Sequence, residues 1–103
     1  MTVKLVALWT KPDDVEGFTK DYEATHAGLC AKLPGIASAI FSTSLDPNSQ
    51  YQRMAELIFD DAAAMGAALG SAEGAELLGD AGRLQETFGN KVDVITVEEQ
   101  GRI

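Results

Sequence analysis

His26 is the only histidine of the chain and the residue best suited to acid–base chemistry. An imidazole has an ordinary pKa of about 6.5, so it can accept or donate a proton near neutral pH. Tyr22 precedes it by one helical turn, where its hydroxyl could orient the imidazole or hydrogen-bond a substrate oxygen. The pair predicts proton transfer at a carbon next to a carbonyl or at a phenol. The alternative is that both rings only pack in the core.

Cys30 is the single cysteine, so neither a disulfide within the chain nor a CxxC motif can form. One cysteine and one histidine are too few for a structural zinc site, and we expect no metal. As a nucleophile Cys30 would need His26 as its base, yet four residues place the thiol about 40° further round the helix. We therefore expect Cys30 to be a small packed thiol.

The segment 14–35 is predicted to be the helix that carries these residues. Its apolar side chains recur at intervals of three and four residues, which places them on one side of an α-helix. They are Val15, Phe18, Tyr22, Leu29 and Leu33. Asp13 or Asp14 can cap the first turn, and Pro34-Gly35 ends the helix. This places His26 at the margin of the apolar stripe, towards the protein interior.

The rest of the chain predicts strands around two helical regions. β-branched and aromatic residues favour strands at 3–9, 36–42, 51–59 and 91–98, with turn formers at 46–49. Asp60-Asp61 and Ser71 are expected to cap helices that run through 62–69 and up to Phe88. The order β-α-β-β-α(α)-β predicts a single α+β domain, 1–103, with the ferredoxin-like βαββαβ fold and helices on one face of a four-stranded antiparallel sheet.

Both faces of the predicted sheet carry apolar side chains. In the first strand Val3, Leu5 and Trp9 point to one face while Val6 and Leu8 point to the other. Helices on one side leave the second face uncovered, so we expect another copy of the chain to cover it. The sequence thus predicts a homodimer formed sheet to sheet. The alternative is that Val6 and Leu8 are scattered exposed residues.

Composition narrows the possible partners and locations. Eight basic against sixteen acidic residues give a net charge of −8, which disfavours binding to nucleic acid and to anionic membranes. No apolar run approaches the roughly 20 residues needed to cross a bilayer, and no signal peptide is evident. We expect a cytoplasmic protein. Neither nucleotide-binding glycine motif is present, so we expect no tightly held organic cofactor.

The chain resembles the EthD family, named for ethyl tert-butyl ether degradation, in the superfamily of dimeric α/β barrels. The resemblance covers nearly the whole chain and is carried by the opening strand VKLVALW, the passage AELIFDD, the segment SAEGAELLGD, the closing VITVEE, and the spacing Phe18-x3-Tyr22-x3-His26-x2-Leu29-x3-Leu33-Pro34-Gly35. EthD-like sequences commonly have a proline shortly after the histidine, where this chain has Gly28. A glycine also weakens a helix, so a bend there remains possible.

The resemblance implies a subunit that dimerises into an α/β barrel with a cavity between sheet and helices. It implies oxidoreductase or monooxygenase-related degradation chemistry on a small apolar or aromatic molecule, with His26 and Tyr22 as catalytic candidates. Four aromatic residues could line the substrate site: Trp9, Phe41, Phe59 and Phe88. Packing explains each of them equally well. The main alternative is a non-catalytic ligand-binding or accessory protein of an oxygenase system, and haem handling is a third.

Overall fold

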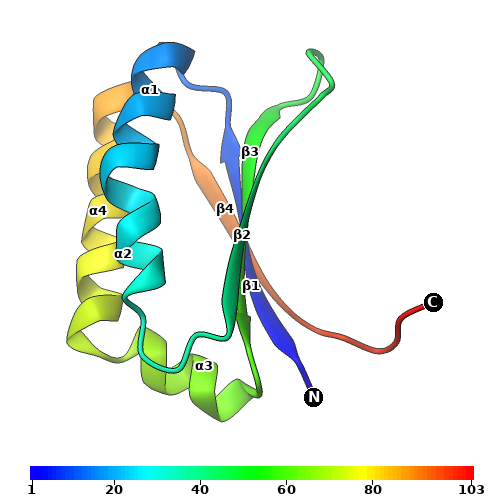
Figure 1. Ribbon diagram of the computed structural model, residues 1–103. Helices are drawn as coiled ribbons and strands as arrows, with labels where there is room; N and C mark the ends of the chain where they lie inside the picture. The colour runs from blue at the N-terminus through cyan, green and yellow to red at the C-terminus, as the bar shows by residue number, and fades with distance from the viewer.

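The computed structural model describes residues 1–103, and it consists of two layers, a sheet and a helical layer on one of its faces (Figure 1). Its elements are β1 (Val3–Thr10), α1 (Val15–Asp21), the π-helical turn η1 (Tyr22–His26), α2 (Ala27–Ala31), β2 (Ser38–Thr43), β3 (Tyr51–Phe59), α3 (Ala62–Leu69), α4 (Ala72–Phe88) and β4 (Val92–Glu98). The predicted α+β, ferredoxin-like arrangement is confirmed for the subunit.

The sheet has four strands in the order β2-β3-β1-β4, and every neighbouring pair is antiparallel. β1 lies in the middle, where Leu5 pairs with Leu57 of β3 and with Thr96 of β4. None of the helices combines the length and apolar character needed to cross a membrane.

Side chains at the helix ends satisfy backbone amides as the sequence predicted. Asp14 accepts a hydrogen bond from the Gly17 amide at 3.0 Å, Asp61 accepts one from Ala64 at 2.8 Å, and Ser71 accepts one from Gly74 at 3.1 Å. Gly89 ends α4 with a φ of 64°, a left-handed conformation that glycine adopts without a steric penalty.

The first helix differs from the predicted regular α-helix, because α1 and α2 are joined through the π-helical turn η1. Ala27 donates its amide to the carbonyl of Tyr22, five residues back. In a regular α-helix, side chains four residues apart drift round the axis by about 40° each time. The wider turn offsets this drift, so residues at four-residue spacing stay on one face. Tyr22, His26 and Cys30 are all at most 5% exposed, as the packed position predicted for Cys30 requires.

Two clusters of buried residues fill the space between helices and sheet. The first, which we call the aliphatic-rich cluster, contains Val3, Cys30, Leu33, Leu57, Phe59, Met65, Ala68 and Leu77. The second, the aromatic cluster, contains Trp9, Phe18, Tyr22 and Leu84. The aromatic cluster packs around the start of the first helix and the end of β1, so the candidate catalytic residues lie where the two clusters meet.

Candidate functional site

A cavity of about 110 Å³ lies between the sheet and the helical layer. Fourteen residues line it, and His26 is the one that is not hydrophobic. Leu78 and Val94 are the exposed ones, at 61% and 52%, so the cavity opens between α4 and β4. An apolar cavity of about 150 Å³ in another protein holds benzene. This cavity therefore suits a small apolar molecule or one apolar portion of a larger molecule.

His26 is held in this cavity by a carboxylate from the opposite helix. Its Nδ1 lies 2.8 Å from Oδ2 of Asp80 in α4, and both side chains are at most 10% exposed. Because an ionised carboxylate can only accept, the hydrogen on Nδ1 is donated to Asp80. Nε2 makes no hydrogen bond within the chain and carries the free lone pair of the neutral ring.

Asp80 belongs to a charge network that runs along the outside of the two helices. Arg83 donates Nε to Asp80 at 2.7 Å, and its Nη1 and Nη2 to the two carboxylate oxygens of Asp21 at 2.9 and 2.6 Å. The bidentate bond fixes the guanidinium between the helices. Arg83 therefore neutralises Asp80 from the solvent side while His26 contacts it from the cavity side.

Burial and charge shift the pKa values of this network in defined directions. Burial lowers the pKa of His26 below its ordinary 6.5, against the opposing effect of the Asp80 hydrogen bond and charge. For Asp80, burial acts to raise the pKa, but hydrogen bonds from Arg83 and His26 outweigh it and hold the pKa below 3.8. At neutral pH the pair is therefore a neutral imidazole beside an ionised carboxylate, which makes Nε2 a proton acceptor.

Trp9 and Tyr22 surround the imidazole with aromatic rings. Their ring centroids lie 5.4 Å and 5.0 Å from that of His26, and both residues line the cavity. The indole Nε1 of Trp9 lies close enough to the Tyr22 hydroxyl to act against the effect of burial on the pKa of that hydroxyl, but no well-aligned hydrogen bond joins them, and both atoms are buried without another partner. Burial raises the pKa of Tyr22, so its hydroxyl stays protonated and can donate a hydrogen bond.

Cys30 also lines the cavity, but its chemistry differs from that of His26. Burial raises the pKa of its thiol from 9.0 to about 11. Because the thiolate is the nucleophilic form, a thiol with this pKa is unreactive at neutral pH. This agrees with the expected packed thiol.

The four aromatic candidates for substrate binding lie in different places. Trp9 lines the cavity, whereas Phe41 is 38% exposed and lines a separate surface hollow. Phe59 is fully buried in the aliphatic-rich cluster, and Phe88 packs edge-on against Phe18. Neither Phe59 nor Phe88 lines the cavity. The structure thus brings His26, Tyr22 and Trp9 together at the cavity, whereas Phe41 contacts Tyr22 from outside it and Phe59 and Phe88 lie elsewhere in the core.

Two residues that contact the site were not identified from the sequence: Asp80, which contacts His26, and Arg53, whose guanidinium lies over the Tyr22 ring. Asp80 lies three residues after Leu77 and four before Leu84, and both leucines are buried. A carboxylate on the apolar side of a helix was therefore the signal in the sequence that could have identified it. Arg53 shares the helix-facing side of β3 with Ala55 and Leu57 and is 8% exposed. No three His, Cys, Asp or Glu side chains are grouped so that they could hold a metal ion.

The fold and the cavity define a class, the α+β proteins of ferredoxin-like fold, and solved structures of that class match the whole chain. An ethyl tert-butyl ether degradation (EthD) family protein from Bacillus halodurans C-125 is 29% identical with a TM-score of 0.87, covering 97% of this chain and 100% of its own. The resemblance to the EthD family is thereby confirmed as a structural match over nearly the whole chain. No family model and no curated protein matches the sequence.

Two more distant structures share the fold. A variant of SnoaB, a cofactor-independent oxygenase from Streptomyces nogalater, is 17% identical with a TM-score of 0.74, covering 99% of this chain and 96% of that one. A dimeric protein of unknown function from Bacteroides fragilis is 15% identical with a TM-score of 0.69, covering 95% and 96%. The fold is therefore shared with an oxygenase and with a dimer.

Proposed function

We propose that the protein is a small-molecule enzyme of oxidoreductase type, in which His26 removes a proton from an apolar or aromatic substrate. The observation that carries the proposal is the 2.8 Å contact between His26 Nδ1 and Asp80, which leaves Nε2 as a base on an apolar cavity. The fold shared with SnoaB supports oxygenase chemistry as the reaction class.

The proposed step is transfer of a proton from a phenol or from a carbon next to a carbonyl to Nε2 of His26. Asp80 stabilises the imidazolium that forms, because its carboxylate already accepts the hydrogen of Nδ1. The substrate is left as a phenolate or carbanion, and such an anion combines with dioxygen and a proton to give a hydroperoxide. The apolar walls exclude water, which strengthens these charge interactions.

Tyr22 and Trp9 are proposed to bind the substrate oxygen and the substrate ring. The Tyr22 hydroxyl is buried and has no partner, so a substrate oxygen could accept its hydrogen. Trp9 provides an aromatic wall beside His26. Phe59 and Phe88 act at most indirectly, through the packing that holds these residues, and Phe41 lies outside this cavity.

The proposal is tested by screening phenols and ketones for oxygen consumption with the purified protein. A substrate should be consumed by the native protein, more slowly by Asp80→Asn, and not measurably by His26→Gln, with all three proteins folded. Binding without turnover in the native protein would instead support the alternative, a ligand-binding or accessory protein.

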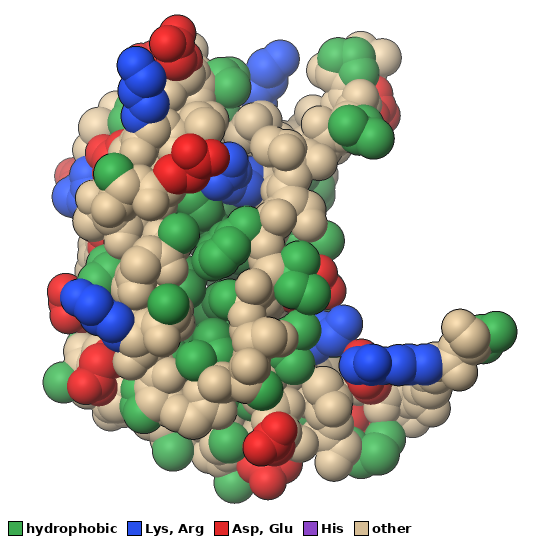
Figure 2. Space-filling view, in the orientation of Figure 1, with side chains coloured by type: hydrophobic (Ala, Val, Ile, Leu, Met, Phe, Trp, Pro, Cys, Tyr) green, Lys and Arg blue, Asp and Glu red, His purple; other side chains and the backbone are tan.

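We also propose that two subunits dimerise through the sheet face opposite the helices, which we call the open face. Ile40, Ile95 and Val97 are 45%, 52% and 38% exposed there, and the relative from Bacteroides fragilis is dimeric. The β2–β3 loop and the C-terminal segment project past opposite ends of this face (Figure 1). In the space-filling view they leave a concave surface between them (Figure 2).

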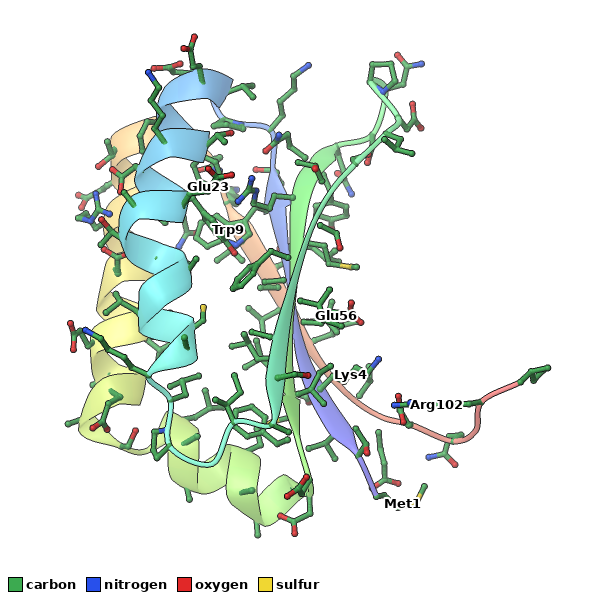
Figure 3. All side chains as sticks on the ribbon, viewed as in Figure 1. Met1, Lys4, Trp9, Glu23, Glu56 and Arg102 are labelled. Atoms are coloured by element: carbon green, nitrogen blue, oxygen red, sulfur yellow. The ribbon has the colours of Figure 1, made fainter.

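Charged residues of the open face are already paired within the subunit. Lys4 contacts Glu56 at 3.4 Å and Glu99 at 3.5 Å, on the side of the sheet away from Trp9 (Figure 3). Light scattering should therefore give a dimer mass for the native protein and a monomer mass for Ile95→Lys. Leu78→Lys, a similar change on the helical layer, should leave the dimer intact. A native monomer at micromolar concentration would contradict the proposal.

A further inference from the structure

A second hollow, of about 400 Å³, lies on the surface between the first helix and the edge formed by β2 and β3. Six residues line it: Glu23, Ala27, Phe41, Ser42, Thr43 and Arg53. Glu23 is seen in Figure 3 on the side of the helix that faces the sheet. This hollow is lined mainly by polar side chains, so it differs in character from the apolar cavity beside His26.

Arg53 is buried in the wall of this hollow with few partners. The residue is 8% exposed, and its guanidinium carbon lies 4.5 Å from the centre of the Tyr22 ring. A guanidinium has five N–H donors. The only hydrogen bond that it makes within the chain runs from Nη2 to Glu23 at 3.4 Å, and Nε is buried without a partner.

The contact with Glu23 is a weak counterpart for a buried cation. The Glu23 side chain is 64% exposed and the distance is long, so water screens the interaction. Burying a charge without full hydrogen bonding destabilises a fold. Stability alone therefore does not account for an arginine at this position.

The neighbours of Arg53 suit the recognition of an aromatic carboxylate. Thr43 lies directly across from Arg53 in the β2–β3 register, and Ser42 adds a second hydroxyl to the wall. Phe41 lies edge-on to Tyr22 with ring centroids 6.0 Å apart, which gives the hollow an aromatic side. A guanidinium binds a carboxylate through two parallel hydrogen bonds, and hydroxyls can add a third.

We propose that this hollow binds the carboxylate of a small aromatic acid, with Arg53 taking the acid in place of Glu23. Tyr22 is the residue common to both sites, since its ring lines the cavity and lies beneath the Arg53 guanidinium. The inference deepens the proposed function by naming an acidic aromatic compound as the ligand class. It rests on that function only where the acid is taken to be the substrate. Binding itself is measured without turnover, so the two proposals can fail separately.

The test compares 2-naphthoate with its neutral analogue 2-naphthamide by calorimetry on the full-length protein. The native protein should bind naphthoate at least about tenfold more tightly, the factor expected for a charge-assisted hydrogen bond. Arg53→Gln should remove this preference. Arg102→Gln, a change in an arginine that is 75% exposed near the C-terminus, should leave it unchanged.

Glu23→Gln provides the test that a purely structural role for Arg53 would not pass. Removing the competing carboxylate should raise the affinity for naphthoate several-fold and leave the affinity for naphthamide unchanged. Because Glu23 is mostly exposed, this variant should fold even if Arg53→Gln does not. Equal affinities for acid and amide in the native protein, or unchanged naphthoate affinity in Glu23→Gln, would overturn the proposal. If the native protein binds naphthoate as predicted but His26→Gln turns over substrate as fast as the native protein, only the catalytic role of His26 is rejected.

Discussion

The two clusters of the core lie between the same sheet and the same helical layer but differ in whether they contain polar side-chain atoms. No side chain of the aliphatic-rich cluster has a nitrogen or oxygen atom, so this part of the core has no side-chain nitrogen or oxygen that needs a partner. In the aromatic cluster, Trp9 Nε1 and Tyr22 Oη have no partner, and Arg53, stacked on Tyr22, leaves Nε unbonded.

This difference indicates which part of the core is organised for something other than stability. Each unsatisfied buried polar group costs about 1–3 kcal/mol, and phenylalanine could fill the place of tyrosine without that cost. Local departures from the most stable choice are expected at functional sites. This supports the proposal that the aromatic cluster, together with His26 and Asp80, is the functional part of the core, and that the aliphatic-rich cluster mainly stabilises the fold.

The largest expected effect is on turnover when His26 is changed to glutamine. General-base catalysis contributes about 10²–10⁴-fold, so kcat should fall by that factor for whichever substrate the screen identifies. The amide can still donate to Asp80, so the thermal unfolding midpoint should change little. A large loss of stability with unchanged turnover would show that His26 belongs functionally with the aliphatic-rich cluster.

Phe59→Ala should give the largest effect on stability. Phe59 is fully buried in the aliphatic-rich cluster, and truncating such a ring costs about 3–5 kcal/mol in the free energy of unfolding. Urea unfolding measures this loss directly. Ligand affinity, corrected for the folded fraction, should stay the same; a specific loss of affinity would return Phe59 to the substrate site that the sequence suggested.

Tyr22→Phe should lower turnover without lowering the stability of the fold. Removing an unpartnered buried hydroxyl should leave the free energy of unfolding unchanged or raise it by about 1 kcal/mol. Turnover should fall if the hydroxyl binds a substrate oxygen. A decrease in stability together with unchanged turnover would mean that the hydroxyl serves only the packing of the aromatic cluster.

Features that are set by residues close together in the sequence could be predicted, and features that depend on other parts of the structure could not. The strands, the caps at Asp61 and Ser71, and the subunit fold follow from local patterns, and the structure confirms them. The π-helical turn η1 does not, because no local pattern in the sequence marks this single wider turn, which changes the direction of every later side chain. Regular helical geometry cannot reveal such a turn.

The site was only partly predictable, for a different reason. His26 and Tyr22 could be identified because a unique histidine and a nearby tyrosine share one helix. Asp80 lies 54 residues away, and pairing it with His26 requires the packing of α4 against the first helix. Arg53 likewise meets Glu23 and Tyr22 only once β3 packs beneath that helix. These contacts depend on tertiary structure, which periodicity along one chain does not specify.

The smallest expected effects are on pH dependence, and here His26 and Cys30 should respond at opposite ends of the scale. Burial lowers the pKa of His26 below 6.5, so between its folded value and 6.5 the unfolded chain binds more protons. Stability conferred by the neutral ring is therefore lost as pH falls below about 6.5. A difference of one between the folded and unfolded pKa values corresponds to about 1.36 kcal/mol in the free energy of unfolding.

In the aliphatic-rich cluster the same reasoning gives the opposite direction for Cys30. Its pKa is raised from 9.0 to about 11, so the folded chain keeps a proton that the unfolded chain has released. Stability conferred by the neutral thiol is therefore lost as pH rises above 9.0. Tyr22 contributes in this alkaline range as well, because burial raises its pKa too.

Unfolding curves of the native protein and two variants measure both effects. The curves from pH 5 to 7 should lose most of their pH dependence in His26→Gln, and those from pH 9 to 11 should lose part of theirs in Cys30→Ala. The lowered pKa of Asp80 changes the free energy of unfolding only below about pH 3.8, so Asp80 does not contribute between pH 5 and 7. An unchanged slope between pH 5 and 7 in His26→Gln would mean that folding does not lower the pKa of His26. A slope of the opposite sign in the native protein would mean that Asp80 raises this pKa, so that the ring binds a proton more tightly and is less available as the proposed base.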